Sequence, residues 1–216
     1  DADLQWSAEQ ALADGIATAG AKTGSILVMN PNNGEILALA TAPSFDSANP
    51  GATDAGNLGN RTVTEAYEPG STAKSFTIAG ALEENAIVPS TQFTCDGYIK
   101  ISDGVHTWTI RCHKRDGHGT LDAEQALMQS CNVYLMDTAF QEGAENFVKY
   151  QHIFGFGEKT EIDLPGEADT KDLIYTADTL GKTSLATNSF GQNYNVSMIQ
   201  MAAGFSSIVN GGSYYK

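Results

Sequence analysis

Ser71 and Lys74 stand three residues apart, directly after a Pro-Gly pair and at the start of an apolar pattern typical of a helix. At this spacing both side chains lie on one face of a helical turn, so the lysine amine can reach the serine hydroxyl. A serine hydroxyl becomes a good nucleophile only when a neighbouring base takes its proton. A lysine can be that base if burial or a nearby cation lowers its pKa. The pair therefore indicates an acylating serine enzyme, with the positive end of the helix dipole favouring an oxyanion.

Ser-x-x-Lys is a short pattern, however, and it arises by chance in many chains. In the alternative interpretation Ser71 caps its helix and Lys74 lies on a solvated face. Only partner residues elsewhere in the chain can decide between these two interpretations.

Ser130 and Asn132 form a second group, at a break between two helical stretches. Because they flank a single residue, both side chains can point into one cleft. The hydroxyl can pass a proton to a leaving amine, and the amide can hold a substrate peptide bond. Serine and asparagine are also common at helix boundaries, and taken alone the pair favours that simpler interpretation.

Cys95, Cys112, Cys131 and His118 form a third group. Three thiolates and one imidazole can make a closed tetrahedral zinc site. The alternative is a Cys95–Cys112 disulfide with Cys131 buried as a small apolar residue, and composition alone does not decide between them. The rival ligands are His113 and, less favoured, Asp96 and Asp116.

Composition limits the possible partners. The chain has 216 residues, of which 41% are hydrophobic, enough for one large domain or two small ones. Its formal charge of −14 opposes a nucleic-acid partner, which would need a basic surface, and opposes docking on anionic lipid. No apolar run approaches the length of a membrane span.

The pattern of apolar residues predicts the elements that position these groups. We expect a helix over 4–19 and a hairpin of strands over 25–30 and 35–40, joined by Pro-Asn-Asn-Gly. Residues 42–66 are rich in Pro, Gly, Asn, Asp and Ser, which predicts a long loop.

The helix that carries Ser71 and Lys74 is expected to continue to about residue 84. Residues 86–118 show no sustained period. Two helical stretches follow from residue 121, broken near Ser130, and a last helix is expected over 197–209.

The sequence Glu-Pro-Gly-Ser-Thr-Ala-Lys over 68–74, followed by Ser-Cys-Asn over 130–132, resembles the transpeptidase domain of penicillin-binding proteins. Residues 33–46, 162–167 and 189–192 are also similar to segments of class B members. The resemblance therefore covers essentially the whole chain. It implies an α/β fold of the penicillin-binding protein and serine β-lactamase type, a mainly antiparallel sheet flanked by helices.

The resemblance also implies roles for the matching residues. Ser71 would be the acylated nucleophile, and its backbone N–H would form half of the oxyanion hole. Lys74 would be the general base, Ser130 would relay a proton, and Asn132 would hold the substrate backbone.

The third motif of that family, Lys-Thr/Ser-Gly, has no match in the expected context. Lys22-Thr23-Gly24 precedes Ser71 and is predicted to be a helix-to-strand turn, and residues 181–184 are equally out of place. We therefore expect residues 1–216 to be the N-terminal and central part of one transpeptidase domain, with the motif and the last strands beyond Lys216. Such a chain is expected to be inactive alone and stable only with the complementary C-terminal fragment.

For the metal, the resemblance favours structural zinc held by Cys95, Cys112, His118 and Cys131, since some class B members carry zinc beside the active site with a histidine in Gly-His-Gly. A metal bond to Cys131 would fix the turn between Ser130 and Asn132.

As partners the resemblance implies peptidoglycan stem peptides, β-lactam antibiotics and a membrane glycosyltransferase that would act with the parent protein. The parent would be anchored at the extracytoplasmic face of a bacterial cell membrane. Rival functions are a D,D-carboxypeptidase, a β-lactamase, a β-lactam sensor and a noncatalytic zinc-stabilised scaffold. Glu167 does not establish the deacylating glutamate of a class A β-lactamase.

Overall fold

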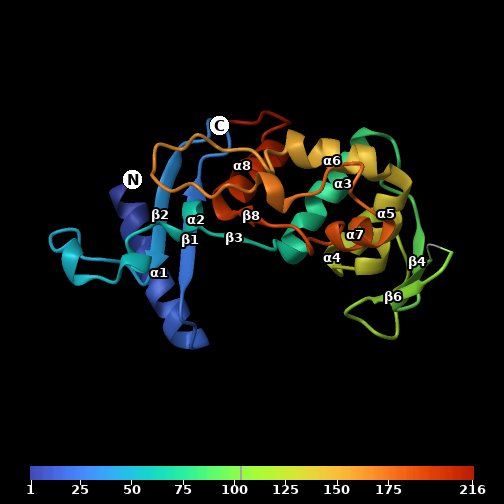
Figure 1. The fold of residues 1–216 in the computed structure, drawn as a ribbon, viewed down its shortest axis with the longest axis horizontal. Coiled ribbons are helices and arrows are strands. Elements are labelled where there is room, and N and C mark those ends of the chain that lie inside the picture. The colour runs from blue at the N-terminus through green and yellow to red at the C-terminus, as the bar shows by residue number, and fades with distance from the viewer. Residues whose placement is uncertain (103) are drawn as a thin grey trace. The chain divides into compact units, whose positions relative to one another are not determined.

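A computed structural model describes residues 1–102 and 104–216. The chain forms two compact units (Figure 1). The first unit contains residues 1–67, 154–171 and 196–216, and the second contains 68–153 and 172–195. All the strand pairs among the described residues are antiparallel, and helices flank them. This is the α/β class that the sequence predicted.

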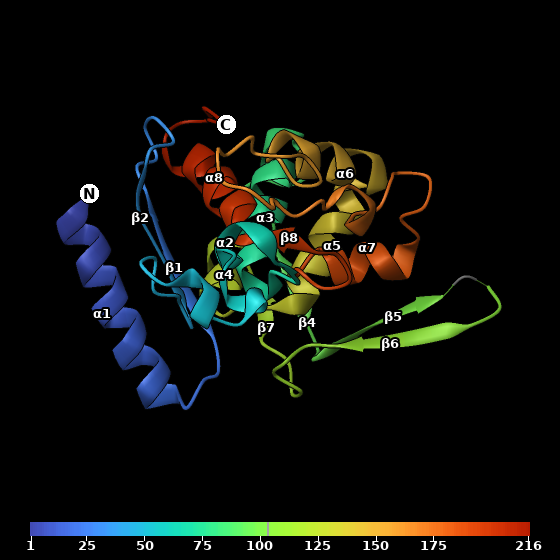
Figure 2. The same ribbon diagram turned by 60° about the vertical axis from the view of Figure 1, so that its left-hand side comes forward.

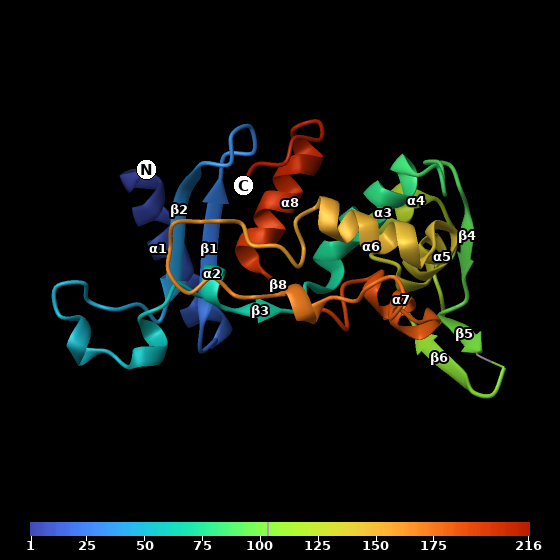
Figure 3. The same cartoon turned by 45° about the horizontal axis from the view of Figure 1, so that its top comes forward.

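The first unit is built on a hairpin of β1 (Gly24–Met29) and β2 (Ile36–Ala42). Helices α1 (Ala2–Ala19) and α8 (Met198–Val209) lie on opposite sides of this hairpin (Figures 2 and 3). Helix α1 buries small and branched side chains against β2, because an alternating strand presents one face to it. The buried residues of this contact are Ala8, Leu12, Ala38 and Ala40.

Short elements complete the first unit. Helix α2 (Arg61–Thr64) is capped by Asn60, whose side chain accepts from the Thr62 N–H. The remaining elements are the 3₁₀ turns η1 (Pro50–Ala52) and η2 (Ala55–Asn57) and the paired strands β3 (Ala66–Tyr67) and β8 (Val196–Ser197).

The helices of the second unit pack around buried apolar residues that form more than one cluster. The 3₁₀ turn η3 (Gly70–Ala73) leads directly into α3 (Lys74–Glu83), and α5 (Asn132–Glu142) packs against α3. The other helices are α4 (Ala123–Met128), α6 (Ala144–Ile153) and α7 (Lys182–Asn188). The 3₁₀ turn η4 (Lys171–Leu173) spans one of the places where the chain passes between the units.

Two strand pairs carry residues 93–121. Strand β4 (Phe93–Cys95) pairs with β7 (Gly119–Leu121), and β5 (Tyr98–Ser102) pairs with β6 (Thr107–Arg111) as a hairpin that projects from the second unit (Figure 2). Cys95 lies just before this hairpin and Cys112 just after it, so the two cysteines stand together at its base.

The predicted helices over 4–19 and 197–209 are confirmed within two residues, and so is the first hairpin. The helix predicted to carry Ser71 and Lys74 ends where expected, but the segment with Ser71 is a 3₁₀ turn and the α-helix begins only at Lys74. Residues 42–66 are largely irregular, as predicted, apart from η1, η2, the short helix α2 and the start of β3. Helices α6 and α7 were not predicted, and neither was the β5–β6 hairpin. No helix formed by the described residues combines the length and the apolar character needed to cross a membrane.

Glu142, at the end of α5, is buried beside Gly80 of α3, and neither carboxyl oxygen has a hydrogen-bond partner among the described residues. Burial, reinforced by the charge of Glu84, raises its pKa to about 8. The folded protein therefore holds this proton above pH 4.5, where the unfolded chain releases it.

We expect stability to fall as pH rises between 4.5 and about 8, by at most roughly 1.4 kcal/mol per pH unit from this group. Glu142→Gln cannot ionise and is expected to remove much of that slope. Urea unfolding across this range measures it, with exposed Glu145→Gln as the matched control. Equal slopes in wild type and Glu142→Gln would contradict the prediction.

Candidate active site and metal cluster

Ser71 and Lys74 occupy the turn η3 and the first residue of α3. In a 3₁₀ turn, residues i and i+3 lie one above the other, so both side chains share a face. Ser71 is exposed, whereas Lys74 is only 1% exposed. The N-cap position of η3 belongs to Pro69, without a side-chain cap. The alternative of a capping serine and a solvated lysine is therefore wrong.

The Lys74 amine donates three hydrogen bonds across to the turn between α4 and α5. Its Nζ lies 2.6 Å from the Ser130 carbonyl oxygen, 2.8 Å from Ser130 Oγ and 2.6 Å from Asn132 Oδ1. Ser130 Oγ in turn donates to Ser71 Oγ at 3.1 Å. The contacts thus connect Lys74 to Ser71 through the Ser130 hydroxyl, a link that the spacing of Ser71 and Lys74 alone did not predict.

Burial lowers the pKa of Lys74 from 10.5 to about 8, although the nearby Cys112 and Cys131 thiols act in the opposite direction. A buried ammonium loses hydration that the three oxygen acceptors only partly replace. A substantial fraction of this lysine is therefore neutral near pH 8, the state that a base requires.

Ser130 adopts a left-handed backbone conformation, with φ 52°. A non-glycine residue in this region costs roughly 1–3 kcal/mol, and such strain is often found at functional sites. The conformation turns the Ser130 carbonyl and hydroxyl to the same amine. The next residue, Cys131, is the N-cap of α5, and its Sγ accepts from the Tyr134 N–H at 3.5 Å.

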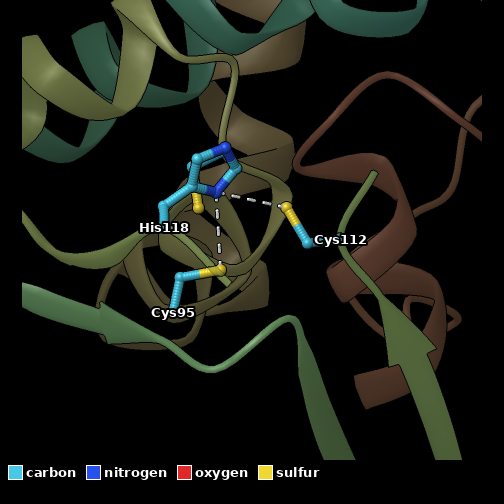
Figure 4. A group of neighbouring side chains, drawn as sticks. Cys95, Cys112 and His118 are labelled. Carbon is cyan, nitrogen blue, oxygen red and sulfur yellow. Dashed lines mark hydrogen bonds between the residues drawn. The ribbon is translucent and has the colours of Figure 1, made fainter. Parts of the chain in front are cut away.

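The four predicted metal ligands come together in the second unit. Their ligand atoms all lie within 4.8 Å of one another, and His118 Nδ1 is 3.6 Å from both Cys95 Sγ and Cys112 Sγ (Figure 4). A tetrahedral zinc ion with ordinary Zn–S and Zn–N bonds separates sulfur and nitrogen by about 3.6 Å. The donor set therefore fits zinc in both chemistry and spacing.

Two of the thiols have pKa values shifted in opposite directions. Burial raises the pKa of Cys131 to about 12, so without a cation this thiol keeps its proton. Burial also raises the pKa of Cys112, but backbone N–H groups of Lys114, Asn132 and Val133 outweigh it and the net pKa is lowered. Backbone donors of this kind stabilise a thiolate ligand.

The rival ligands are less well placed. His113 Nδ1 lies 3.8 Å from Cys112 Sγ, but the group of mutually close ligand atoms among the described residues contains His118 and not His113. Asp96 and Asp116 are not part of that group either. All three cysteines are free, so the alternative Cys95–Cys112 disulfide is not formed.

Neither copy of the third motif has the strand context of the family motif. Lys22 and Thr23 connect α1 to β1 in the first unit. Gly181 is the N-cap of α7, and the Lys182 amine lies 5.9 Å from the centre of the Phe140 ring. A Lys-Thr/Ser-Gly strand beyond Lys216 therefore stays a prediction.

Three contacts to the segment around Ser71 were missed by sequence reasoning. They come from the turn that follows α7, where Ser189, Gly191 and Asn193 approach residues 68–77. The sequence singles out residues 189–192 by their resemblance to a family segment, but neither that resemblance nor the glycine in Phe-Gly-Gln identifies a contact partner.

The fold and the grouping of Ser71, Lys74, Ser130 and Asn132 define an α/β protein with a serine–lysine site. The chain belongs to a known family of this class, because the family model for the penicillin binding protein transpeptidase domain matches residues 24–216.

Among curated relatives, stage V sporulation protein D of Bacillus subtilis is 39% identical over 191 residues, covering 88% of this chain and 29% of that protein. The peptidoglycan D,D-transpeptidase MrdA of Acinetobacter baumannii is 33% identical over 184 residues, covering 78% of this chain and 26% of that protein. The chain spans less than a third of the length of each.

Solved structures share the fold. A peptidoglycan glycosyltransferase from Burkholderia ambifaria superposes with a TM-score of 0.84 at 25% identity, covering 100% of this chain and 64% of that one. Pseudomonas aeruginosa PBP2 in complex with WCK 5153 gives a TM-score of 0.84 at 26% identity, covering 97% and 50%.

Proposed function

We propose that the protein containing this chain is a peptidoglycan D,D-transpeptidase that works through an acyl-enzyme on Ser71. The observation that carries the proposal is the hydrogen-bonded series from buried Lys74 through Ser130 to the exposed Ser71 hydroxyl. Membership of the transpeptidase family and relatives named as peptidoglycan D,D-transpeptidases support it.

In the proposed reaction, Ser71 Oγ attacks the carbonyl carbon between the two residues of a stem peptide that ends in D-Ala-D-Ala. Neutral Lys74 receives the Ser71 proton through Ser130 Oγ, which lies within hydrogen-bond distance of both groups. For this transfer the two hydroxyls rotate, so that Ser71 Oγ donates to Ser130 Oγ and Ser130 Oγ donates to Lys74 Nζ. The C–N bond then breaks, and Ser130 passes a proton to the departing D-Ala amine. An amine from a neighbouring stem attacks the ester, which restores Ser71 and forms the cross-link.

Asn132 has a double role in this proposal. Its Oδ1 accepts from Lys74, which leaves the side-chain NH₂ to donate to a substrate carbonyl. The Ser71 backbone N–H supplies half of the oxyanion hole, and the other half would come with the Lys-Thr/Ser-Gly strand beyond Lys216. On this proposal residues 1–216 alone are inactive, and the complementary C-terminal segment completes the domain.

A labelled penicillin tests the proposal in the full-length protein. We expect one covalent adduct per chain by intact mass, formed on Ser71 and lost in Ser71→Ala. A folded full-length protein that acquires no label would contradict the enzyme proposal and support a noncatalytic scaffold.

Deacylation separates the remaining enzymes. A long-lived adduct supports a transpeptidase or a sensor, whereas rapid loss of the adduct supports a β-lactamase, and hydrolysis of D-Ala-D-Ala peptides without cross-linking supports a D,D-carboxypeptidase.

The Glu167 carboxylate accepts from the N–H and hydroxyl of Thr160 within the first unit. This engagement gives no support to a deacylating role for Glu167.

We further propose that Cys95, Cys112, His118 and Cys131 bind a structural zinc ion. Four protein ligands leave no open position, so the metal would supply rigidity and no activated water.

The parent protein is proposed to be anchored at the outer face of the cell membrane, where its peptidoglycan substrate lies and where a membrane glycosyltransferase could act beside it.

The lowered pKa of Lys74 predicts the pH dependence of acylation. Because the neutral amine is the reactive form, the acylation rate is expected to rise about tenfold per pH unit below about 8 and to level off above it. Stopped-flow measurement with a fluorescent β-lactam checks this. A flat profile across this range would contradict Lys74 as the base.

A further inference from the structure

The turn from Asn188 to Asn193 contacts the nucleophile segment on both sides of Ser71. Before the serine, the Gly70 N–H donates to the Gly191 carbonyl at 2.8 Å, and the Asn193 N–H donates to Glu68 Oε1 at 2.7 Å. After it, Thr77 Oγ1 donates to the Ser189 carbonyl at 2.9 Å. All of these residues belong to the second unit.

The closest approach is between the two glycines. Gly191 has φ 82°, a conformation that side chains disfavour, and a Cβ there would lie 1.9 Å from the Gly70 carbonyl oxygen. It would also lie 2.6 Å from the Gly70 nitrogen. Because these neighbours are backbone atoms of the residue next to Ser71, any side chain at position 191 must push the turn and Gly70 apart.

The turn itself is firmly held. Asn188 is fully buried, and its Nδ2 donates to the carbonyls of Gln192 at 3.1 Å and Asn193 at 3.4 Å. Ser189 Oγ donates to the Ala186 carbonyl, and Asn193 Nδ2 donates to the Tyr175 hydroxyl at 2.9 Å. A turn fixed from within can act as a rigid support.

We propose that residues 188–193 are a positioning element that sets the place of Ser71 Oγ relative to Ser130 Oγ, with Glu68 and Gly191 as its two decisive contacts. The proposal rests on the proposed acyl transfer at Ser71. Ser71 is exposed on the short 3₁₀ turn η3, whose first residue, Gly70, has a left-handed conformation with φ 58°. Such a segment needs outside support, and a misplacement of about 1 Å can cost about a hundredfold in rate.

Glu68 allows the sharper test, because it is exposed and its removal leaves the core intact. In the full-length protein, Glu68→Ala is expected to lower the rate constant of penicillin acylation by about tenfold or more, with little change in the dissociation constant of the preceding complex. Glu68→Gln retains an oxygen that accepts from the Asn193 N–H and is expected to restore most of the rate.

Gly191→Ala is the second variant, with an expected loss of about a hundredfold or more in the same rate constant. Gly181→Ala is the matched control, since Gly181 has φ −66° and a Cβ there would meet nothing within 4 Å. Amide hydrogen exchange at Gly70 gives a reading independent of activity. It is expected to speed up in Glu68→Ala and Gly191→Ala and to stay unchanged in Glu68→Gln and Gly181→Ala.

The outcomes distinguish the two proposals. A wild-type protein that takes no label contradicts the acyl-transfer proposal. In that case the exchange rate of the Gly70 amide still tests whether residues 188–193 hold Gly70 in place. Wild-type label with equal rates in Glu68→Ala and Glu68→Gln overturns the positioning element alone. Unchanged Gly70 exchange in both Glu68→Ala and Gly191→Ala overturns it as well.

Discussion

Replacing Lys74 with methionine is expected to lower the rate of Ser71 acylation by about 10²–10⁴-fold, the usual contribution of a positioned base. Methionine keeps the length and the burial of the side chain but cannot accept a proton. The change also removes the donor for Ser130 Oγ, the carbonyl of Ser130 and Asn132 Oδ1. The loss of the base and the loss of these hydrogen bonds both slow acylation. The loss of the base also abolishes the rise of the acylation rate with pH.

The stability of Lys74→Met is the control for this prediction. Removing the buried amine also removes the free-energy cost of its desolvation, which stabilises the protein. Each of its three acceptors loses a donor, which costs about 1–3 kcal/mol if water does not replace the lysine. These terms oppose each other, so a folded variant with a modest change in stability is expected, as monitored by thermal unfolding. A folded Lys74→Met protein that acylates at the wild-type rate would exclude Lys74 as the base.

Elements with a long apolar stripe could be predicted from the sequence, as α1 and α8 show. Helix α6 could not, because its helical state depends on Phe147 and Val148 packing against Leu180 and Leu185, which are distant in sequence. The β5–β6 hairpin was also missed, although Ile99 and Ile101 alternate with polar residues in the way typical of a half-buried strand.

For the site, residue types could be predicted but their conformations could not. Serine rarely adopts positive φ, so no pattern in the sequence predicts the left-handed conformation of Ser130. The chain of contacts through Ser130 depends on that conformation. The support from Gly191 likewise depends on a contact between residues more than a hundred positions apart. Spacing within a helix carries information about neighbours, but it carries none about such distant contacts.

Removal of the proposed zinc is expected to lower thermal stability and acylation together. The cluster joins the base of the β5–β6 hairpin, through Cys95 and Cys112, to Cys131 at the start of α5. Without the metal, three buried thiols and an imidazole must share a site with no ion to hold them. A loss of about 3–4 kcal/mol would lower Tm by about 10 °C in a protein of this size.

The expected loss of acylation has a local cause. Cys131 stands between Ser130 and Asn132, and Ser130 holds a strained conformation that its surroundings must maintain. Freeing Cys131 lets that turn relax, which separates the Ser130 hydroxyl from Ser71 and Lys74. We therefore expect the rate constant of acylation to fall about tenfold or more when a chelator removes the metal, and to recover when zinc is added back.

His118→Ala and His113→Ala form a matched pair for this prediction. Both histidines lie near Cys112 Sγ, at 3.6 Å and 3.8 Å, but only His118 is close to the other ligand atoms. Metal analysis of the purified proteins is expected to find one zinc per chain in wild type and His113→Ala, and a loss of zinc in His118→Ala. Wild-type protein that contains no metal and has a mass lower by two hydrogen atoms would contradict the zinc site and indicate a disulfide. Two of the three thiols would then be joined and could not act as separate ligands.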